Sequence, residues 1–511
     1  MRKVFVLMLM LAVVLSAQYM AWRQRDVVVT TETLAGNPVD HFHAPGGSQN
    51  VVIVAHGFAS NKEMMRPWGH YLAAAGFETY VIDEPGHGAS RKDLGSWRAD
   101  GPDSLGVNLS TIVDQLILMK QATPGKIALV GHSMGGAAVT QSALIDQRVK
   151  ATVALSSAYG QALPADKPVN LLSLAAERDP ANMVETVTVL ATQADNGKGV
   201  LGKQYGSFKD GTARSSDIID GRNHITILYD AGVMERAANW IAASLGAATP
   251  VTAGPYGWPW VMLGLAGALG LVFALGSLLS PPEVKRSVRN LPRVGLLTGN
   301  VMVAVAAFSA VIAAAWFRIP WLKLAVVDYL LAYMLVMAAV FMALRLLWPR
   351  DFGFPVSTEP EADLGGLVRA GVLFLGFVGA VGTIVHMNLS NFVPTGHRVL
   401  LMIPLAIVLW LYMSQEEGLK RAISNELGPW AGFLTGLIGK FVIIATWMGA
   451  SALPNPQAFL PLTIPVVLPV FLLIEVYSYA LAIWRYPAGS VAAFSSLVLA
   501  WSMAVTMPLL G

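Results

Sequence analysis

The stretch "KIALVGHSMGGAAVT", Lys126–Thr140, joins an apolar run to a series of small residues through a turn that carries one serine. Residues 131–135 read G-x-S-x-G, in which glycines remove side chains where the backbone is tight, so that a serine hydroxyl can stand exposed above a sheet. The pattern predicts a strand, a sharp turn and a helix, with Ser133 as a nucleophile. A structural serine at a helix N-terminus is the alternative.

A serine hydroxyl needs a general base, and after such a turn the acid and then the histidine follow along the chain. Within the polar first half of the chain, only His224 follows the turn, in a loop before a predicted helix. Asp179 ends an apolar run and precedes Pro180, so it is the predicted acid. Glu177, two residues earlier on the same face of that strand, is the competing acid.

A tetrahedral intermediate also needs two backbone N–H donors for its oxyanion. One is predicted to come from Met134, the residue after the nucleophile. The other is predicted to come from Phe58, in the turn after the apolar run "VVIVAHG".

Several further apolar runs end in glycine or polar residues, and helical patterns separate them. This alternation predicts an α/β fold with a mostly parallel sheet covered on both faces. The more polar residues 26–46 predict a leading antiparallel pair. The predicted buried strands lie within 50–58, 77–90, 126–133, 149–158 and 169–179.

The blocks "HGFASNK", "DEPGHGAS" and "GHSMGG" resemble the α/β-hydrolase superfamily, and most closely its monoacylglycerol-lipase and serine-aminopeptidase-like branch. The resemblance covers about residues 28–245 and implies the α/β-hydrolase fold, a Ser-His-Asp mechanism and a preference for esters over amides. Many relatives carry a helical cap after the strand 149–158. Here only "YGQALPADKP" separates that strand from the next, so we expect a minimal cap.

The composition points to a second, different part of the chain. The 511 residues are 54% hydrophobic and 13% charged, against about 25% charged in a typical soluble domain. The net charge of +3 is small and spread out, so no nucleic-acid partner is expected. The absence of cysteine excludes disulfides and thiol nucleophiles.

The apolar surplus lies at the N-terminus and in the second half. Residues 1–22 have a basic start and a long apolar run, which favours an uncleaved anchor over a cleaved signal peptide. The second half predicts eight membrane spans. They are placed near 259–279, 294–317, 324–347, 367–388, 398–414, 430–449, 462–484 and 488–510.

The distribution of lysine and arginine between these spans predicts the orientation. With the N-terminus inside, twelve basic residues lie on the inner side and three in the outer loops between later spans. Residues 26–255 are therefore expected on the outer (periplasmic or extracellular) face. The predicted organisation is an anchor (1–25), a catalytic domain (26–248), a linker (249–258) and an eight-helix transmembrane domain (259–511).

Four polar residues fall within the predicted spans. Lys440 and Glu475 lie near the middle of two consecutive antiparallel spans, where a charge is costly and is expected to find a partner. His386 and Asp328 lie nearer the outer ends of theirs. The set is interpreted either as a Lys–Glu pair that locks two helices or as a polar cavity leading toward Ser133.

His41 and His43 form an H-x-H pair on a predicted strand. With no third ligand evident in the sequence, they are expected to be surface residues, and neither a metal nor a cofactor is predicted. The leading hypothesis is a multi-pass membrane serine hydrolase acting on an acyl ester, lipid or lipidated substrate. The alternatives are a serine peptidase and a transporter-like membrane protein with an attached hydrolase domain.

Overall fold

The computed structural model describes residues 2–94, 104–159, 163–164, 166–248, 257–281, 295–316, 323–347, 364–396, 398–450 and 460–510. The chain divides into two compact units. The first, called here the α/β unit, holds residues 15–262 with two short later segments, 386–391 and 508–511. The second, called here the helical unit, holds residues 1–14, 263–385 and 392–507.

The α/β unit is built on one sheet with the strand order β1-β2-β4-β3-β5-β6-β7-β9-β8. Its centre, from β4 through β9, is parallel, while β1, β2 and β8 pair antiparallel at the two edges. The predicted fold class is confirmed. The strands are β1 (Val28–Leu34), β2 (Asn37–His43), β3 (Val51–Ala55), β4 (Glu78–Ile82), β5 (Ile127–His132), β6 (Val149–Leu155), β7 (Leu171–Arg178), β8 (Gln204–Tyr205) and β9 (Arg214–Asn223).

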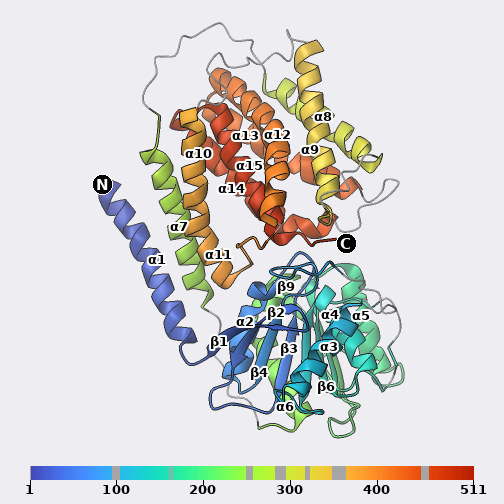
Figure 1. The fold of residues 1–511 in the computed structure, drawn as a ribbon. Helices are drawn as coiled ribbons and strands as arrows, with labels where there is room; N and C mark the ends of the chain where they lie inside the picture. Colours follow the sequence, from blue (N-terminus) through green and yellow to red (C-terminus); the bar gives the residue numbers. More distant parts are fainter. Residues whose placement is uncertain are drawn as a thin grey trace. The chain divides into compact units, whose positions relative to one another are not determined.

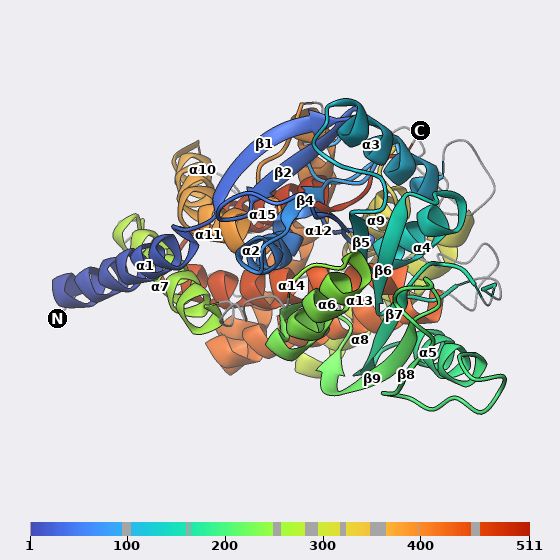
Figure 2. The same cartoon turned by 90° about the horizontal axis from the view of Figure 1, so that it is seen from below.

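Helices cover both faces of this sheet, because its central strands are apolar on both sides. Figure 2 shows α2 and α6 on one side and α3 and α4 on the other, and each pair packs on its own core. One core includes Trp68 and Trp240, and the other includes Leu109 and Val139. The helices and 3₁₀ turns of this unit are η1 (Lys62–Met65), α2 (Arg66–Ala74), α3 (Leu105–Leu118), α4 (Met134–Ile145), α5 (Ala181–Gln193), η2 (Thr226–Tyr229) and α6 (Ala231–Leu245).

The rest of the described chain is helical (Figure 1), and nine helices are long and apolar enough to cross a membrane. This is compatible with a multi-pass membrane protein. The first of them, α1, packs against α7, where Gly267 and Gly270 face Leu9. The helices are α1 (Arg2–Gln24), α7 (Trp258–Leu278), α8 (Leu296–Trp316), α9 (Val327–Leu347), α10 (Leu364–Phe377) with η4 (Val378–Gly382) and α11 (Thr383–Asn388), α12 (Arg398–Leu427), α13 (Pro429–Gly449), α14 (Leu460–Ile483) and α15 (Ala488–Thr506).

One predicted span boundary is wrong. The span expected at 398–414 continues as α12 to Leu427. The charged residues that seemed to end it are buried and paired with other charges, so the helix can continue through them. Lys420 and Arg421 therefore lie in a helix and not in the inner loop where the predicted boundary placed them.

The predicted linker 249–258 lies outside the described residues up to position 256. The segment expected to replace the cap, between β6 and β7, is described only in part. The predicted leading antiparallel pair and the predicted buried strands of the α/β unit are all present. The short strand β8 and the 3₁₀ turns were not predicted from the sequence.

Candidate active site

The turn between β5 and α4 has the geometry that the G-x-S-x-G pattern predicts. Ser133 has φ 54° and ψ −116°, a left-handed conformation that is costly for a residue with a side chain and that turns the serine outward. A Cβ added to Gly131 would collide with the carbonyl of Gly135, and one added to Gly135 would lie 2.5 Å from His56 O. Only glycine fits at these two positions, so the sequence forces the sharp turn.

The structure brings the three residues of the predicted triad together. His224 Nδ1 donates to Asp179 Oδ1 at 2.6 Å, and His224 Nε2 lies 3.1 Å from Ser133 Oγ. Because Nδ1 carries the proton shared with the carboxylate, Nε2 can accept the hydroxyl proton. The imidazole is partly accessible, with 23% of its side-chain surface exposed, so a substrate can reach it.

Asp179 is held on its second oxygen as well. Ser156 Oγ donates to Asp179 Oδ2 at 2.5 Å and the Ala176 backbone N–H donates to the same atom at 2.7 Å. Burial raises the pKa of Asp179, but the hydrogen bonds from His224 and Ser156 outweigh it, so the pKa lies below its usual value. Glu177, the competing acid, accepts instead from the Gly221 backbone N–H at 2.7 Å.

Two buried histidines that the sequence did not single out frame this site. His132 Nε2 donates to the backbone carbonyl of His224 at 2.8 Å, which fixes the loop that carries the imidazole. His56 donates from Nδ1 to Gly57 O and accepts at Nε2 from the Glu84 backbone N–H. Burial lowers the pKa of His56 to about 4 and that of His132 to about 3, so both rings are neutral and act as structural hydrogen-bonding groups. In the sequence, only their positions next to Gly57 and Ser133 could have indicated that these two histidines support the site.

The two predicted oxyanion donors lie on the turns that meet at Ser133. Met134 is the first residue of α4, whose N-terminus has a partial positive charge. A Cβ added to Gly57 would lie 3.2 Å from Ser133 Cβ, so the turn that carries Phe58 runs close to the serine. The arrangement suits stabilisation of an oxyanion between the two turns.

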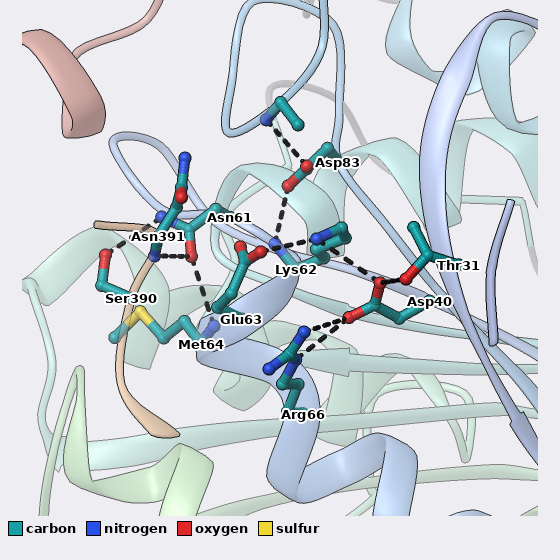
Figure 3. A network of polar contacts seen from close by, with 11 residues as sticks. Thr31, Asp40, Asn61, Lys62, Glu63, Met64, Arg66, Asp83, Ser390 and Asn391 are labelled. Carbon is teal, nitrogen blue, oxygen red and sulfur yellow. Dashed lines mark hydrogen bonds and ion pairs between the residues drawn. The ribbon is translucent and has the colours of Figure 1, made fainter. Parts of the chain in front are cut away.

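The turn that carries Phe58 is anchored at its far end, three residues on (Figure 3). Asn61 donates to Ser390 Oγ at 3.0 Å and accepts from the Asn391 backbone N–H at 2.8 Å. The next residue, Lys62, donates its backbone N–H to Asp83 at 2.8 Å. Residues 386–391, late in the sequence, thus complete a loop of the α/β unit.

The side chains of Lys62 and its neighbours form a compact charge network in the same view. Lys62 Nζ lies 2.5 Å from Glu63 and 3.4 Å from Asp40, which also binds Arg66 at 2.8 Å. Burial opposes the charge on Lys62, but the surrounding carboxylates outweigh it and raise its pKa. The network fixes η1 and α2 to β2 and β4.

In the helical unit, Lys440 and Glu475 are neighbours, but the cluster is larger than the predicted pair. Lys440 Nζ lies 2.9 Å from Glu475 and 2.5 Å from Glu416, and Lys420 binds Glu475 at 2.8 Å. Glu417 pairs with Lys420 and Arg421 at 2.9 and 3.0 Å, and Ser478 donates to Glu417 at 2.7 Å. Three cations and three carboxylates therefore balance. The members are Glu416, Glu417, Lys420, Arg421, Lys440 and Glu475.

The sequence missed four members of this cluster because the predicted span ended before them. A cavity of about 130 Å³ opens beside it, lined by charged and polar side chains that include Lys420, Glu475 and Tyr479. The other two predicted intramembrane residues lie elsewhere. Asp328 is in the first turn of α9 and His386 is in the last turn of α11.

The fold and the serine turn together define the α/β unit as an α/β-hydrolase domain, which confirms the resemblance found in the sequence. Residues 46–200 match the family described as serine aminopeptidase, S33. That match covers less than half of the chain. No curated protein matches this chain.

Several solved structures are similar to this chain. TT1662 from Thermus thermophilus has 17% identity and a TM-score of 0.31, and the alignment covers 43% of this chain and 99% of that one. An esterase of Pyrococcus furiosus, Pf2001, has 17% identity, a TM-score of 0.33 and coverages of 43% and 93%. A bacterial membrane phospholipase A has 12% identity, a TM-score of 0.33 and coverages of 46% and 93%.

Proposed function

We propose that this protein is a membrane-bound serine hydrolase that cleaves acyl esters of lipids or lipidated molecules. The observation that carries the proposal is the hydrogen-bonded series from Ser133 Oγ through His224 to Asp179, at 3.1 and 2.6 Å. A serine at this turn with a base within reach is the arrangement that activates a hydroxyl for acyl transfer.

In the proposed reaction, Ser133 Oγ attacks the acyl carbonyl while His224 Nε2 takes the hydroxyl proton. The oxyanion accepts hydrogen bonds from the backbone N–H groups of Met134 and Phe58. His224 then donates its proton to the leaving alcohol, and the acyl-enzyme remains. A water molecule, deprotonated by His224, releases the acid, while Asp179 orients the imidazole and stabilises its charged form.

The proposed preference for a lipid rests on the surroundings of the domain in the sequence. Apolar helices precede and follow it in the sequence, and the described residues between β6 and β7 form no helix that could serve as a lid. A substrate that already resides in a bilayer would not need a lid to shield its acyl chain from water.

The test is labelling of the full-length protein in detergent by a fluorophosphonate. Ser133→Ala should abolish the labelling, whereas Ser110→Ala, on α3, where the hydroxyl contacts Ser142 of α4, should leave it unchanged. Hydrolysis of p-nitrophenyl esters should rise with acyl chain length from acetate to laurate. Full labelling of the Ser133→Ala protein would refute the proposal, and cleavage of aminoacyl arylamides in place of all esters would favour a serine peptidase.

We further propose that the hydrolase domain lies on the outer face of the cell membrane, on the basis of the excess of basic residues on the predicted inner side. The chain has no cysteine, so single cysteines report position directly. Glu185→Cys, on α5, should react with an impermeant maleimide in intact cells, and Ser287→Cys should react only after lysis. The opposite pattern would reverse the orientation.

A second candidate function is supported by the six-charge cluster and the adjoining cavity of about 130 Å³. One helix would suffice as an anchor, and buried charges in membrane segments are characteristic of transport pathways. In this second candidate function, the helical unit transports the acid or alcohol that the hydrolase releases across the bilayer. In proteoliposomes, Glu475→Gln should then slow transfer of the product across the bilayer without slowing hydrolysis. Equal transfer by both proteins would leave the helices as an anchor.

A further inference from the structure

Three side chains meet on one face of the sheet, from β2 and β4, the second and third strands from one edge. His41 and His43 alternate along β2 and so point to the same side. β4 pairs antiparallel with β2 and places Tyr80 opposite His41, which brings Glu78 beside His43. One ligand atom from each of His41, His43 and Glu78 can be chosen so that all lie within 4.8 Å of one another.

The distances within this group are close to those around a small metal ion. His41 Nε2 lies 2.8 Å and His43 Nδ1 lies 3.5 Å from Glu78 Oε2, and the two imidazole centroids are 3.8 Å apart. Ligands at 2.0–2.2 Å from a tetrahedral Zn²⁺ are separated from each other by about 3.3–3.6 Å. Small side-chain rotations would therefore place the three donors around one ion.

The opposite nitrogen of each ring also faces an oxygen atom. His41 Nδ1 lies 3.5 Å from Glu32 Oε1, and His43 Nε2 lies 3.0 Å from Thr30 Oγ1, both on β1. Metal-binding histidines almost always donate their second ring N–H to a carboxylate or another acceptor, which fixes the tautomer and the ring direction. β1 thus supplies the outer support that such a site requires.

Charge and exposure fit a cation as well. Two carboxylates, Glu32 and Glu78, surround two imidazoles that are neutral when they act as ligands. The side chains of His41 and Glu78 are largely buried, whereas 39% of the His43 side chain is exposed. An ion could therefore enter past His43 and retain one water ligand on that side.

We propose that His41, His43 and Glu78 bind a divalent transition-metal ion, for which Zn²⁺ is the best fit, and that the ion fastens β2 to β4. Imidazole with carboxylate is a donor set that suits such ions. The site is separate from the serine triad and takes no part in the proposed reaction. The expectation that the H-x-H pair lacks a third ligand is wrong, because Glu78 is distant in sequence and only strand pairing brings it near.

Without an ion, the same groups would form a hydrogen-bonded set in which His41 lies between Glu32 and Glu78. The two interpretations differ in what added metal does. A bound ion should raise the melting temperature as its concentration rises, because it binds the folded chain alone. A hydrogen-bonded set that binds no ion should leave the melting temperature unchanged.

The experiment uses the full-length protein, purified in detergent with a histidine-free tag and stripped with a chelator. Titration with Zn²⁺, followed by calorimetry, should show one high-affinity site per chain, and Co²⁺ should give the strong visible absorption of tetrahedral nitrogen and oxygen ligation. His43→Gln and Glu78→Gln should each weaken Zn²⁺ binding by 100-fold or more. Glu32→Gln should weaken it by about 10–100-fold, as expected for an outer support.

The control is Glu185→Gln, which removes an exposed carboxylate elsewhere on the unit and should leave the affinity unchanged. Circular dichroism without metal should be the same for all variants, which separates loss of the site from loss of the fold. Absence of a high-affinity site in the parent protein would overturn the proposal. Equal Zn²⁺ affinity in the parent, His43→Gln and Glu78→Gln proteins would overturn it too.

Discussion

The protein buries charge in two different ways, in the triad of the α/β unit and in the six-charge cluster of the helical unit. The triad is a linear series with one carboxylate, and its hydroxyl end is open to a reactant. The cluster is a closed set of three cations and three carboxylates, in which Glu475 contacts both Lys420 and Lys440. In both arrangements the charged groups have partners, but only the triad ends in a group, the Ser133 hydroxyl, that is available to react with a substrate.

The difference indicates which kind of change each region tolerates. In the triad, removal of one group destroys an alignment while the surrounding sheet keeps the fold. In the cluster, removal of one group leaves an opposite charge buried without its partner, which costs stability. Activity is therefore the appropriate measurement for the first region and stability for the second.

The largest expected effect is on turnover. Asp179→Asn should lower kcat by about 10⁴-fold, because the amide no longer holds His224 in the tautomer that accepts a proton from Ser133. Glu177→Gln should change kcat less than about threefold, since Glu177 contacts the Gly221 backbone. Steady-state hydrolysis of one ester measures both. A larger loss in Glu177→Gln than in Asp179→Asn would transfer the acid role to Glu177.

The second prediction concerns the stability of the cluster. Lys440→Met should lower the free energy of unfolding by about 3–5 kcal/mol, because two carboxylates lose a shared cation. Glu416→Gln should rescue this variant better than Glu475→Gln does, since Glu475 keeps Lys420 as a partner. Thermal unfolding of the single and double variants gives the coupling energies. Equal rescue by the two substitutions would show that Lys440 stabilises Glu416 and Glu475 to the same extent.

Glu84 is an intermediate case, a fully buried carboxyl in the α/β unit that belongs to neither region. Burial raises its pKa from 4.5 to about 8, and Asn108 and Lys92 offset only part of this. Between these pH values the folded chain retains a proton that the unfolded chain has lost, so this group's contribution to stability falls as the pH rises from 4.5 to about 8. Glu84 should lower the free energy of unfolding by up to about 1.4 kcal/mol for each pH unit in this range, and the Glu84→Gln protein should not show this decrease.

The measurement for Glu84 is the melting temperature of the parent and the Glu84→Gln protein from pH 5 to pH 8. The difference between the two should grow in favour of the variant toward pH 8. Parallel curves would show that the carboxyl is ionised in both states throughout this range.

The smallest expected effect tests how firmly the triad is held. Ser156→Ala removes one hydrogen bond to Asp179 but leaves those from Ala176 and His224. We expect kcat/KM to fall about tenfold, equivalent to about 1.4 kcal/mol, with KM unchanged. Ser110→Ala serves as the matched control. A loss as large as that of Asp179→Asn would make Ser156 essential to the alignment.

Local chemistry explains what could be predicted from the sequence. Ser133 lies in a pattern whose glycines are required by the turn, and a strand before it and a helix after it restrict the possible fold. His224 and Asp179 followed from chain order and strand ends. By contrast, Ser156, His132 and the Glu78 neighbour of His43 depend on which strands pair, and a single sequence does not specify that pairing.

The cluster shows a second limit. Hydropathy treats each charge as a cost, so it ended the span 398–414 before Glu416. The structure offsets that cost with partners on α13 and α14, which lie later in the chain. Lys440 and Glu475 could be recognised because each is isolated within an apolar run, whereas Glu416 and Lys420 lie among other polar residues.

The two late segments of the α/β unit also determine when it can be completed during synthesis. Asn61 binds residues 390 and 391, and the Leu509 backbone bonds to Gly86 and Leu94 at 2.8 Å each. At about 5–20 residues per second, a ribosome that has finished residue 248 needs roughly 13–50 s more to reach Leu509. The turn that carries Phe58 thus gains its contacts with residues 390 and 391 only after α11 has been made, and the loop from Gly86 to Leu94 gains its contacts with Leu509 only after α15.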